Sequence, residues 1–424
     1  MTLRANYRAS TSTPNEADAV LRAVPLWKQF AAFSFGFFIQ WNILIGGSGE
    51  GAAAVGGYGF RITDFLSVIG LALLGIHALS PRRMLASALF GLIVAVLIVP
   101  RILNSSVDPR TLILLEHYAL YSFAGLYIAV LLSDSVACDR FCWGLIAGLL
   151  ATIPIFVLQA NEFTSALIDL GLVPAYYRIL QITFAAASRY AGLWGHPNEA
   201  SHVAALAAAA GAYFTVAYRR LLPLVIVAAA FVVIFWYTQS RGGFLAAGLT
   251  LCISVLVARQ KGTKILPPLL PAILLIIGII FALQIDFIAS RLVYDPGTAT
   301  NYEERTASLV AGLNIVLANP FGLPMTEFEA LMRSDTGGIA TPHNGFVFFA
   351  AVFGVVPFAI LIAAFVANLK TKDTTDVFFA FFSLQIGISM LFEEVPLSYC
   401  YALSLCMILG RAYLKTPIGR ILTT

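Results

Sequence analysis

Apolar stretches of about twenty residues recur along the whole chain, and they constrain its fold more than any other feature. Of the 424 residues, 59% are hydrophobic and only 11% are charged, whereas a soluble domain has about 25% charged residues. A helix needs about 20 apolar residues to cross a bilayer. The pattern predicts an all-α integral membrane protein with about twelve spans. The expected spans are 27–46, 62–80, 84–100, 111–133, 141–159, 199–217, 221–237, 243–258, 265–285, 344–369, 375–391 and 397–414.

The basic residues predict which ends of these spans face the cytoplasm. An even number of spans puts both termini on one side, so we expect an N-terminal tail at 1–26, a membrane domain at 27–414 and a C-terminal tail at 415–424. Seventeen of the 26 Lys and Arg residues lie on one side: in both tails, at the adjacent span ends (Lys28 and Arg411), and in the connections "SPRRM", "SDSVACDR", "YRR", "ARQKGTK" and "KTKD". The positive-inside rule makes this side cytoplasmic.

The opposite side holds nine basic residues, and all of them are arginine, whereas all six lysines lie on the cytoplasmic side. The planar fork of arginine binds phosphate or carboxylate at two points and stays charged. An arginine-only outer face therefore favours anionic ligands, although a GC-rich genome would also favour arginine.

Two outer connections, roughly 160–198 and 286–343, are long, and long loops are often functional. In "NYEERTASLVAGLNIVLANPFGLP" the apolar residues recur at helical spacing until Asn319, Pro320 and Gly322. We expect an amphipathic helix at the outer membrane interface there, and "PAYYRILQITF" in the other loop has the tyrosines typical of that zone.

Other chemistries find little support in the sequence. The five cysteines lack metal-ligand spacing and are interpreted as small buried hydrophobic residues. We find no nucleotide-binding loop, so no cofactor, metal or nucleic acid is expected. The acidic pair Glu393 and Glu394 in "FEEVP" faces outward and could bind a cation, but it is interpreted as a capped or solvated turn. His117 is a candidate for an outer pocket, and His77 is interpreted as structural.

Three outer segments contain residues suited to chemistry. In "SRYAGLWGHPNEASH", Arg189 precedes a turn, Pro197 suits a helix start, and Asn198 and His202 share a helix face. A capped helix start explains this spacing equally well.

In "TQSRGGFLAAG", a helix that begins after Ser240 would direct its N–H groups toward an anion beside Arg241. A tight turn between two helices is the alternative. In "TPHNGFVFF", Pro342 suits a helix start and Asn344 can bond locally. His343 is the residue there that can exchange a proton near neutral pH. An ionisable side chain at membrane depth is costly and tends to have a function, but in the headgroup region that cost would be small.

These blocks together resemble the O-antigen ligase and polymerase family. "RYAGLWGHPNEAS", "SRGGFLA", Arg305 followed by "NPFGLP", and "PHNGFVFFAAVFGVVPFAIL" follow one another in the family's order, across about residues 185–370. Members are periplasm-facing glycosyltransferases of the bacterial inner membrane with a GT-C-like helical fold. They transfer a glycan from undecaprenyl pyrophosphate to an acceptor sugar.

The resemblance implies roles for particular residues. Arg189, Arg241 and Arg305 match family arginines that hold the pyrophosphate, and His343 matches the histidine that activates the acceptor hydroxyl. His196, Asn198, His202 and Asn344 are further pocket candidates. The resemblance implies inverting, metal-independent transfer at the periplasmic face, within a bilayer whose lipids surround the chain.

Three alternatives stay open. A ligase joins O-antigen to lipid A core, whereas a polymerase extends a second lipid-linked glycan, and the quoted blocks are shared by both. A twelve-helix secondary transporter has the same topology, but transporters carry charges near the midplane, which this chain lacks. A membrane scaffold would not explain the outer Arg and His blocks. Neither the sugar nor the oligomeric state is predicted.

Overall fold

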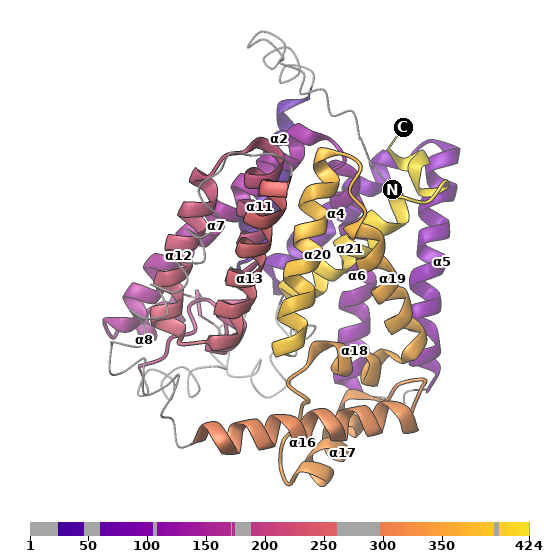
Figure 1. Cartoon of the computed structure of the whole chain (residues 1–424). Helices are drawn as coiled ribbons and strands as arrows, with labels where there is room; N and C mark the ends of the chain where they lie inside the picture. Colours follow the sequence, from indigo (N-terminus) through magenta and orange to yellow (C-terminus); the bar gives the residue numbers. More distant parts are fainter. Residues whose placement is uncertain are drawn as a thin grey trace.

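The computed structural model describes residues 24–45, 60–104, 108–170, 172–173, 188–260, 297–393 and 398–423. Within these ranges the chain is a bundle of helices with a single short pair of strands (Figure 1). The strands β1 (Leu44–Ile45) and β2 (Phe60–Arg61) are antiparallel, with Leu44 opposite Arg61. The expected helical membrane class is therefore confirmed.

The helices of the first half precede those that contain the candidate residues. They are α2 (Leu26–Phe38), α4 (Ile62–His77), α5 (Pro81–Asn104), α6 (Pro109–Leu131), α7 (Ser135–Ala160) and α8 (Thr164–Asp169). The remaining helices are α10 (Pro197–Ala204), α11 (Leu206–Tyr218), α12 (Leu222–Thr238), α13 (Arg241–Gln260), α16 (Gly297–Ala318), α17 (Met325–Thr336), α18 (Gly345–Phe353), α19 (Val355–Leu369), α20 (Thr374–Phe392), α21 (Tyr399–Leu414) and the 3-10 turn η4 (Gly419–Leu422).

Six helical stretches in the described part of the chain are long and apolar enough to cross a bilayer. They are Pro81–Val99, Pro109–Leu131, Ser135–Ala160, Pro197–Tyr218, Arg241–Ala258 and Thr374–Phe392. Four shorter apolar helices accompany them: α4, α12, α19 and α21. The chain is thus a multi-pass membrane protein. The total of twelve spans stays a prediction, because the expected span 265–285 lies outside the described residues, as does "PAYYRILQITF".

Two expected spans have the wrong boundaries. The stretch 27–46 is not one helix, because α2 ends at Phe38 and the chain then enters β1. The stretch 344–369 is broken at Gly354, which has φ +95°. A Cβ on Gly354 would lie 2.9 Å from the backbone of Phe321. The loop before α17 compensates the break, because Val355 N donates to Pro320 O at 2.8 Å.

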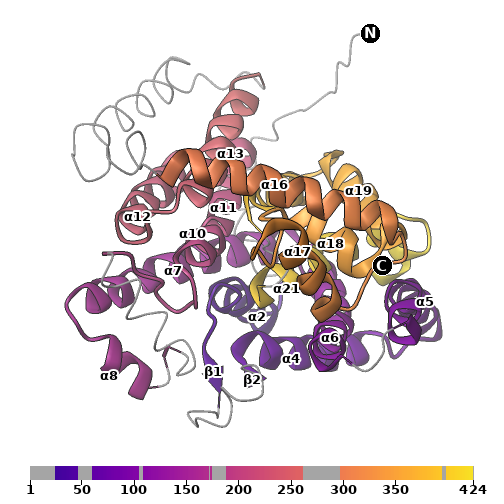
Figure 2. The same cartoon turned by 90° about the horizontal axis from the view of Figure 1, so that it is seen from below.

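The helix α16 lies across the ends of the other helices, with α17 beside it (Figures 1 and 2). The predicted helix in this region is confirmed, and its end at Ala318 agrees with the expected stop. We call this end of the bundle the α16 end and the opposite one the η4 end, because η4 lies there.

The residue Asp108 holds α17 against the start of α6. Its carboxylate accepts hydrogen bonds from Thr111 Oγ1 at 2.6 Å and from the Thr326 amide at 3.2 Å, and it also caps α6 through the Arg110 amide. Burial raises the pKa of this carboxyl, but the hydrogen bonds outweigh that effect and hold it below its ordinary value. Arg110 also pairs with Glu329 of α17 at 3.3 Å.

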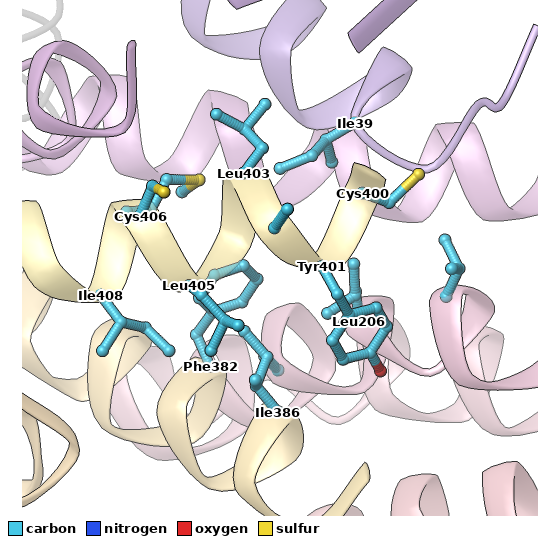
Figure 3. Packing of buried hydrophobic residues seen from close by; sticks show 14 of the residues in the cluster. Ile39, Leu206, Phe382, Ile386, Cys400, Tyr401, Leu403, Leu405, Cys406 and Ile408 are labelled. Carbon is cyan, nitrogen blue, oxygen red and sulfur yellow. The ribbon is translucent and has the colours of Figure 1, made fainter. Parts of the chain in front are cut away.

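The core lies where α21 meets its neighbours, and small residues allow the close contacts. A Cβ on Gly125 of α6 would lie 2.5 Å from the backbone of Cys406 in α21, so this approach requires glycine. Figure 3 shows α21 side chains such as Tyr401 and Leu405 packed against Phe382 and Ile386 of α20. Four of the five cysteines are buried among such apolar side chains, as expected, and Cys252 is half-buried.

Candidate functional site

The starts of α10, α13 and α18 and the end of α20 meet at the α16 end of the bundle. A Cβ on Gly242 at the start of α13 would lie 2.9 Å from the His202 ring and 3.2 Å from Phe392 of α20. The predicted segments, which are far apart in the sequence, therefore converge, and the absence of side chains on Gly242 and Gly243 lets α13 approach α10.

The segment before α10 is held in place by the C-terminal end of α12 and by α7. Gly192 adopts φ +60°, its amide donates to Gln159 Oε1 at 2.8 Å, and its carbonyl accepts from Gln159 Nε2. Trp194 is fully buried. This packing positions Arg189, whose Nε donates to the Thr238 carbonyl at 3.2 Å and whose Nη2 donates to Asn198 Oδ1 at 3.0 Å.

The start of α10 follows the local prediction. Pro197 is the first helical residue, and His196 is the N-cap, with Nδ1 accepting from the Asn198 amide at 3.1 Å. The predicted pocket residue His196 therefore has a structural role as a helix cap. Asn198 makes two longer-range contacts, since its Oδ1 accepts from Arg189 and its Nδ2 donates to Glu393 Oε2 at 3.2 Å.

The residue Glu393 was misjudged from the sequence. The sequence predicts a capped or solvated turn here, yet the Glu393 side chain is only 13% exposed. It contacts both Asn198 and His343. Its Oε1 lies 3.8 Å from His343 Nδ1. The available signal was an acidic pair directly after an apolar span at the same face as the other candidates. Its partners could not be recognised from the sequence, because they lie about 50 and 195 residues away in the chain.

The residue His343 lies just before α18 with φ +48°, a left-handed conformation that is uncommon outside glycine. Its side chain is 33% exposed. The helix does not begin at Pro342 as expected, because Asn344 is the N-cap, with Oδ1 accepting from the Val347 amide at 3.0 Å. The local bond predicted for Asn344 is thus present, and its Nδ2 also donates to the Leu391 carbonyl at 3.4 Å.

The other two arginines approach the same end. Arg241 is the first residue of α13 and follows the buried Ser240, as the sequence predicted for the helix start. Arg305 comes from α16, where it is exposed, and its Nη1 donates to the carbonyl of Phe392, the residue before Glu393. A pair of cationic side chains therefore comes from elements on either side of the α20 terminus.

The predicted pocket residue His202 lies one turn deeper. It is 1% exposed, its ring lies against Gly242, and its carbonyl accepts from Tyr401 Oη at 2.6 Å. This burial separates His202 from the more accessible Asn198 on the same helix face.

A second histidine–carboxylate pair lies between α4 and α6. His117 Nε2 is 3.3 Å from Asp64 Oδ1, and His117 Nδ1 is 2.6 Å from the Ile113 carbonyl. Asp64 also accepts from Tyr121 Oη and from the Arg61 amide. The Arg61 guanidinium is 3.9 Å from the Tyr399 ring centroid. His117 thus belongs to a network of polar side chains between α4 and α6.

The site residues that the structure brings together are Arg189, Asn198, Glu393 and His343, with Arg305 and the start of α13 beside them. Among the described residues, no group of three His, Cys, Asp or Glu side chains could hold a metal ion. The arrangement offers guanidinium groups that can bind an anion. Contacts through Asn198 and Glu393 connect one of them, Arg189, to the His343 imidazole, which can accept a proton.

A comparison with protein families covers part of the stretch that forms this site. A search of curated proteins found no match for the chain. The family model described as O-antigen ligase matches residues 226–362, a stretch that includes Arg241, Arg305 and His343. Arg189 and Asn198 precede the matched stretch and Glu393 follows it. These three residues are therefore brought to Arg241, Arg305 and His343 by the fold and not by the family match. Residues 226–362 are therefore similar to the O-antigen ligase family, and this similarity supports a membrane glycosyltransferase of the ligase or polymerase type.

Proposed function

We propose that the chain transfers a glycan from undecaprenyl pyrophosphate to an acceptor sugar hydroxyl at the periplasmic face, and that it acts as an O-antigen ligase with lipid A core as the acceptor. The observation that supports this best is the line of contacts from Arg189 through Asn198 and Glu393 to His343. It supports the assignment of Arg189 to the leaving group and of His343 to the acceptor, because these contacts connect the two side chains.

The chemical step needs two kinds of group. The acceptor oxygen attacks the anomeric carbon, the bond from that carbon to the pyrophosphate oxygen breaks, and the acceptor proton moves to His343 Nδ1 or Nε2. Negative charge grows on the departing pyrophosphate, so fixed guanidinium groups of Arg189, Arg241 and Arg305 stabilise the transition state more than the ground state. Attack opposite the leaving group inverts the anomeric centre.

The carboxylate of Glu393 has a separate task. A carboxylate beside an imidazole orients the ring and stabilises the imidazolium that forms when the base accepts a proton. At 3.8 Å the pair is longer than a hydrogen bond, and catalytic contacts often tighten only with substrate bound. Glu393 is therefore proposed as a positioning residue and His343 as the base.

The direct test is transfer by the purified full-length protein in nanodiscs, with a lipid-linked glycan as donor. Lipid A core and a second lipid-linked glycan are offered as acceptors in separate reactions. A ligase glycosylates the lipid A core, whereas a polymerase lengthens the lipid-linked glycan. Absence of transfer to either acceptor by folded protein would refute the proposal.

The orientation is tested separately in intact cells whose outer membrane has been permeabilised. Cysteines are introduced at Asp335 in α17 and at Lys372 before α20, which are both exposed and lie at opposite ends of the bundle. A reagent that cannot cross the inner membrane should label the first and spare the second. The reverse result would place the site in the cytoplasm.

A further inference from the structure

A cavity of about 1170 Å³ lies at the η4 end of the bundle, opposite the candidate site. It is lined by the ends of α4, α6, α19 and α21, by the starts of α2, α5 and α20, and by η4. None of the candidate site residues lines it. We call it the η4 cavity.

The η4 cavity is rich in positive charge. Its lining includes seven lysine or arginine residues and three aspartates. The most exposed of the basic side chains are Lys370, Lys372 and Arg420. A cavity with such a surplus of cations attracts anions, and phosphate is the anion for which clustered Lys and Arg are best suited.

The three aspartates do not neutralise those exposed cations. Asp376 pairs with Arg411 at 2.9 Å and with Lys415 at 3.0 Å. Asp373 and Asp134 cap the starts of α20 and α7.

Within the described part of the chain, Lys370, Lys372 and Arg420 have no carboxylate at ion-pair distance. These three side chains are therefore available to a ligand.

An apolar groove continues from the η4 cavity along the outside of α19. It has a volume of about 630 Å³, runs from Val355 to Lys370, and shares Ala367 and Lys370 with the cavity. Fifteen helical rises correspond to roughly 22 Å, more than half of the ~30 Å hydrocarbon core. Trp27 and Ile76 at the cavity wall are 52% and 66% exposed, as expected for side chains that face lipid.

We propose that the η4 cavity and the α19 groove together bind one anionic, phosphate-bearing lipid. Its phosphate lies among Lys370, Lys372 and Arg420, and one acyl chain follows α19. Basic pockets between membrane helices bind anionic headgroups in this way, and the shared position of Lys370 joins the charged and apolar parts. The proposal rests on the proposed function in one respect only. If the candidate site faces the periplasm, the η4 end faces the cytoplasm, and the lipid comes from the cytoplasmic leaflet.

The test uses full-length protein purified in a neutral detergent without glycan substrates. The protein is mixed with phosphatidylglycerol, with phosphatidylcholine of the same acyl chains, or with inorganic phosphate. Native mass spectrometry counts retained lipid, and a thermal scan gives Tm. One molecule of phosphatidylglycerol should be retained and should raise Tm, whereas phosphatidylcholine and inorganic phosphate should leave Tm unchanged.

Two variants separate the parts of the site. The double variant Lys370→Gln, Lys372→Gln should bind phosphatidylglycerol about 30-fold more weakly, from about 1 kcal/mol for each basic residue. Ala363→Trp in the groove should weaken it about tenfold, the equivalent of two lost buried CH₂ groups. The matched control, Arg219→Gln with Arg220→Gln, removes two exposed charges at the same end outside the cavity and should bind like wild type.

Three results would overturn the proposal. Equal retention of the two lipids would show that the site does not select an anionic headgroup. Wild-type retention by the double lysine variant would show that the lipid does not bind in the η4 cavity. A Tm rise with inorganic phosphate as large as that with lipid, unaffected by Ala363→Trp, would make free phosphate the ligand. Because no transfer is measured, failure here leaves the proposed glycosyl transfer untouched, and failure of transfer leaves the lipid result untouched.

Discussion

His117 with Asp64 forms one histidine–carboxylate pair at the α16 end, and His343 with Glu393 forms the other. The first pair is tight, at 3.3 Å, with side chains 19% and 5% exposed. The second is looser, at 3.8 Å, with side chains 33% and 13% exposed. Both nitrogens of His117 face acceptors within the protein, whereas His343 lies on a strained backbone at the mouth of α18.

From this difference we propose that the first pair is structural and the second reactive. A histidine that is held on both sides by acceptors within the protein fits a structural role, and His117 is less exposed than His343. A partly exposed histidine beside a carboxylate has the arrangement of a general base and its orienting group. Identical residue types thus have different proposed roles because of accessibility and partners.

The largest expected effect separates the two histidines. His343→Ala should lower turnover by roughly 10² or more, the usual scale for general acid–base catalysis, with little change in donor binding. His117→Ala should keep turnover per folded molecule within a few-fold. Donor binding and product formation are measured separately in nanodiscs.

Near-normal turnover in His343→Ala, or an equal loss in His117→Ala, would break the comparison. The acceptor-activating role would then move elsewhere, with His196 and His202, the histidines of the α10 segment, the first residues to test. His343→Gln, which keeps hydrogen bonding without basicity, should not restore turnover.

The arginines proposed to hold the pyrophosphate should contribute to donor binding. Arg189→Ala and Arg241→Ala should each weaken donor binding about 10- to 100-fold, because a charge-assisted phosphate contact is lost. Lysine should rescue poorly, since a point charge does not replace a two-point fork. Binding of a lipid-linked donor to purified protein measures this.

The control is Arg333→Ala, which removes an exposed arginine of α17 that pairs with Glu329 at the same end. Wild-type donor binding by both Arg189→Lys and Arg241→Lys would show that the pyrophosphate assignment is wrong.

Replacement of Glu393 should affect catalysis only through His343. Glu393→Gln should lower kcat about tenfold and leave KM for the donor unchanged, within the usual range for a positioning partner of a general base. In a His343→Ala background the same change should cost nothing further, since the pair acts as a unit. Additive losses in the double variant would mean that Glu393 acts independently of His343.

Stability should depend more on Asp64 than on Glu393. Asp64→Ala removes the partner of His117, Tyr121 and the Arg61 amide, and breaking a buried pair costs about 3 kcal/mol or more. Glu393→Ala, at the more accessible pair, should cost roughly 1 kcal/mol. Thermal unfolding in one detergent compares them, and an equal Tm loss for the two variants would remove the distinction between structural and reactive pairs.

The smallest effect concerns Asp108, a carboxylate at the same end that only docks and caps helices. Asp108→Asn should cost about 1 kcal/mol, the usual value of a helix cap. Because the pKa of Asp108 is lowered in the folded protein, its stabilisation is complete above the ordinary carboxyl pKa of about 4. It is lost as the pH falls through the lower folded-state pKa.

The Tm difference between wild type and Asp108→Asn should therefore be constant from pH 7 to pH 5 and vanish at more acidic pH. A difference that grows on acidification would contradict the assigned hydrogen bonds.

The sequence by itself determined the helical membrane class, the helix across the α16 end with its stop at Ala318, and the starts of α10 and α13. These features are local, because a run of apolar residues, a proline at the first helical position or an Asn–Pro stop acts within a few residues of itself. The family blocks likewise directed attention to Arg189, Arg241, Arg305 and His343, because each of these residues lies in or just before a block that can be recognised in the sequence.

Only the tertiary structure decided which helix ends meet. Periodicity shows which face of a helix is apolar, but it carries no information about the partner of a polar residue at the helix terminus. Glu393 is proposed as a positioning residue because α20 ends beside α10 and α18, and His117 is proposed as structural because α4 presents Asp64 to it. The break at Gly354 also depends on a distant loop, since Pro320 accepts the freed amide of Val355.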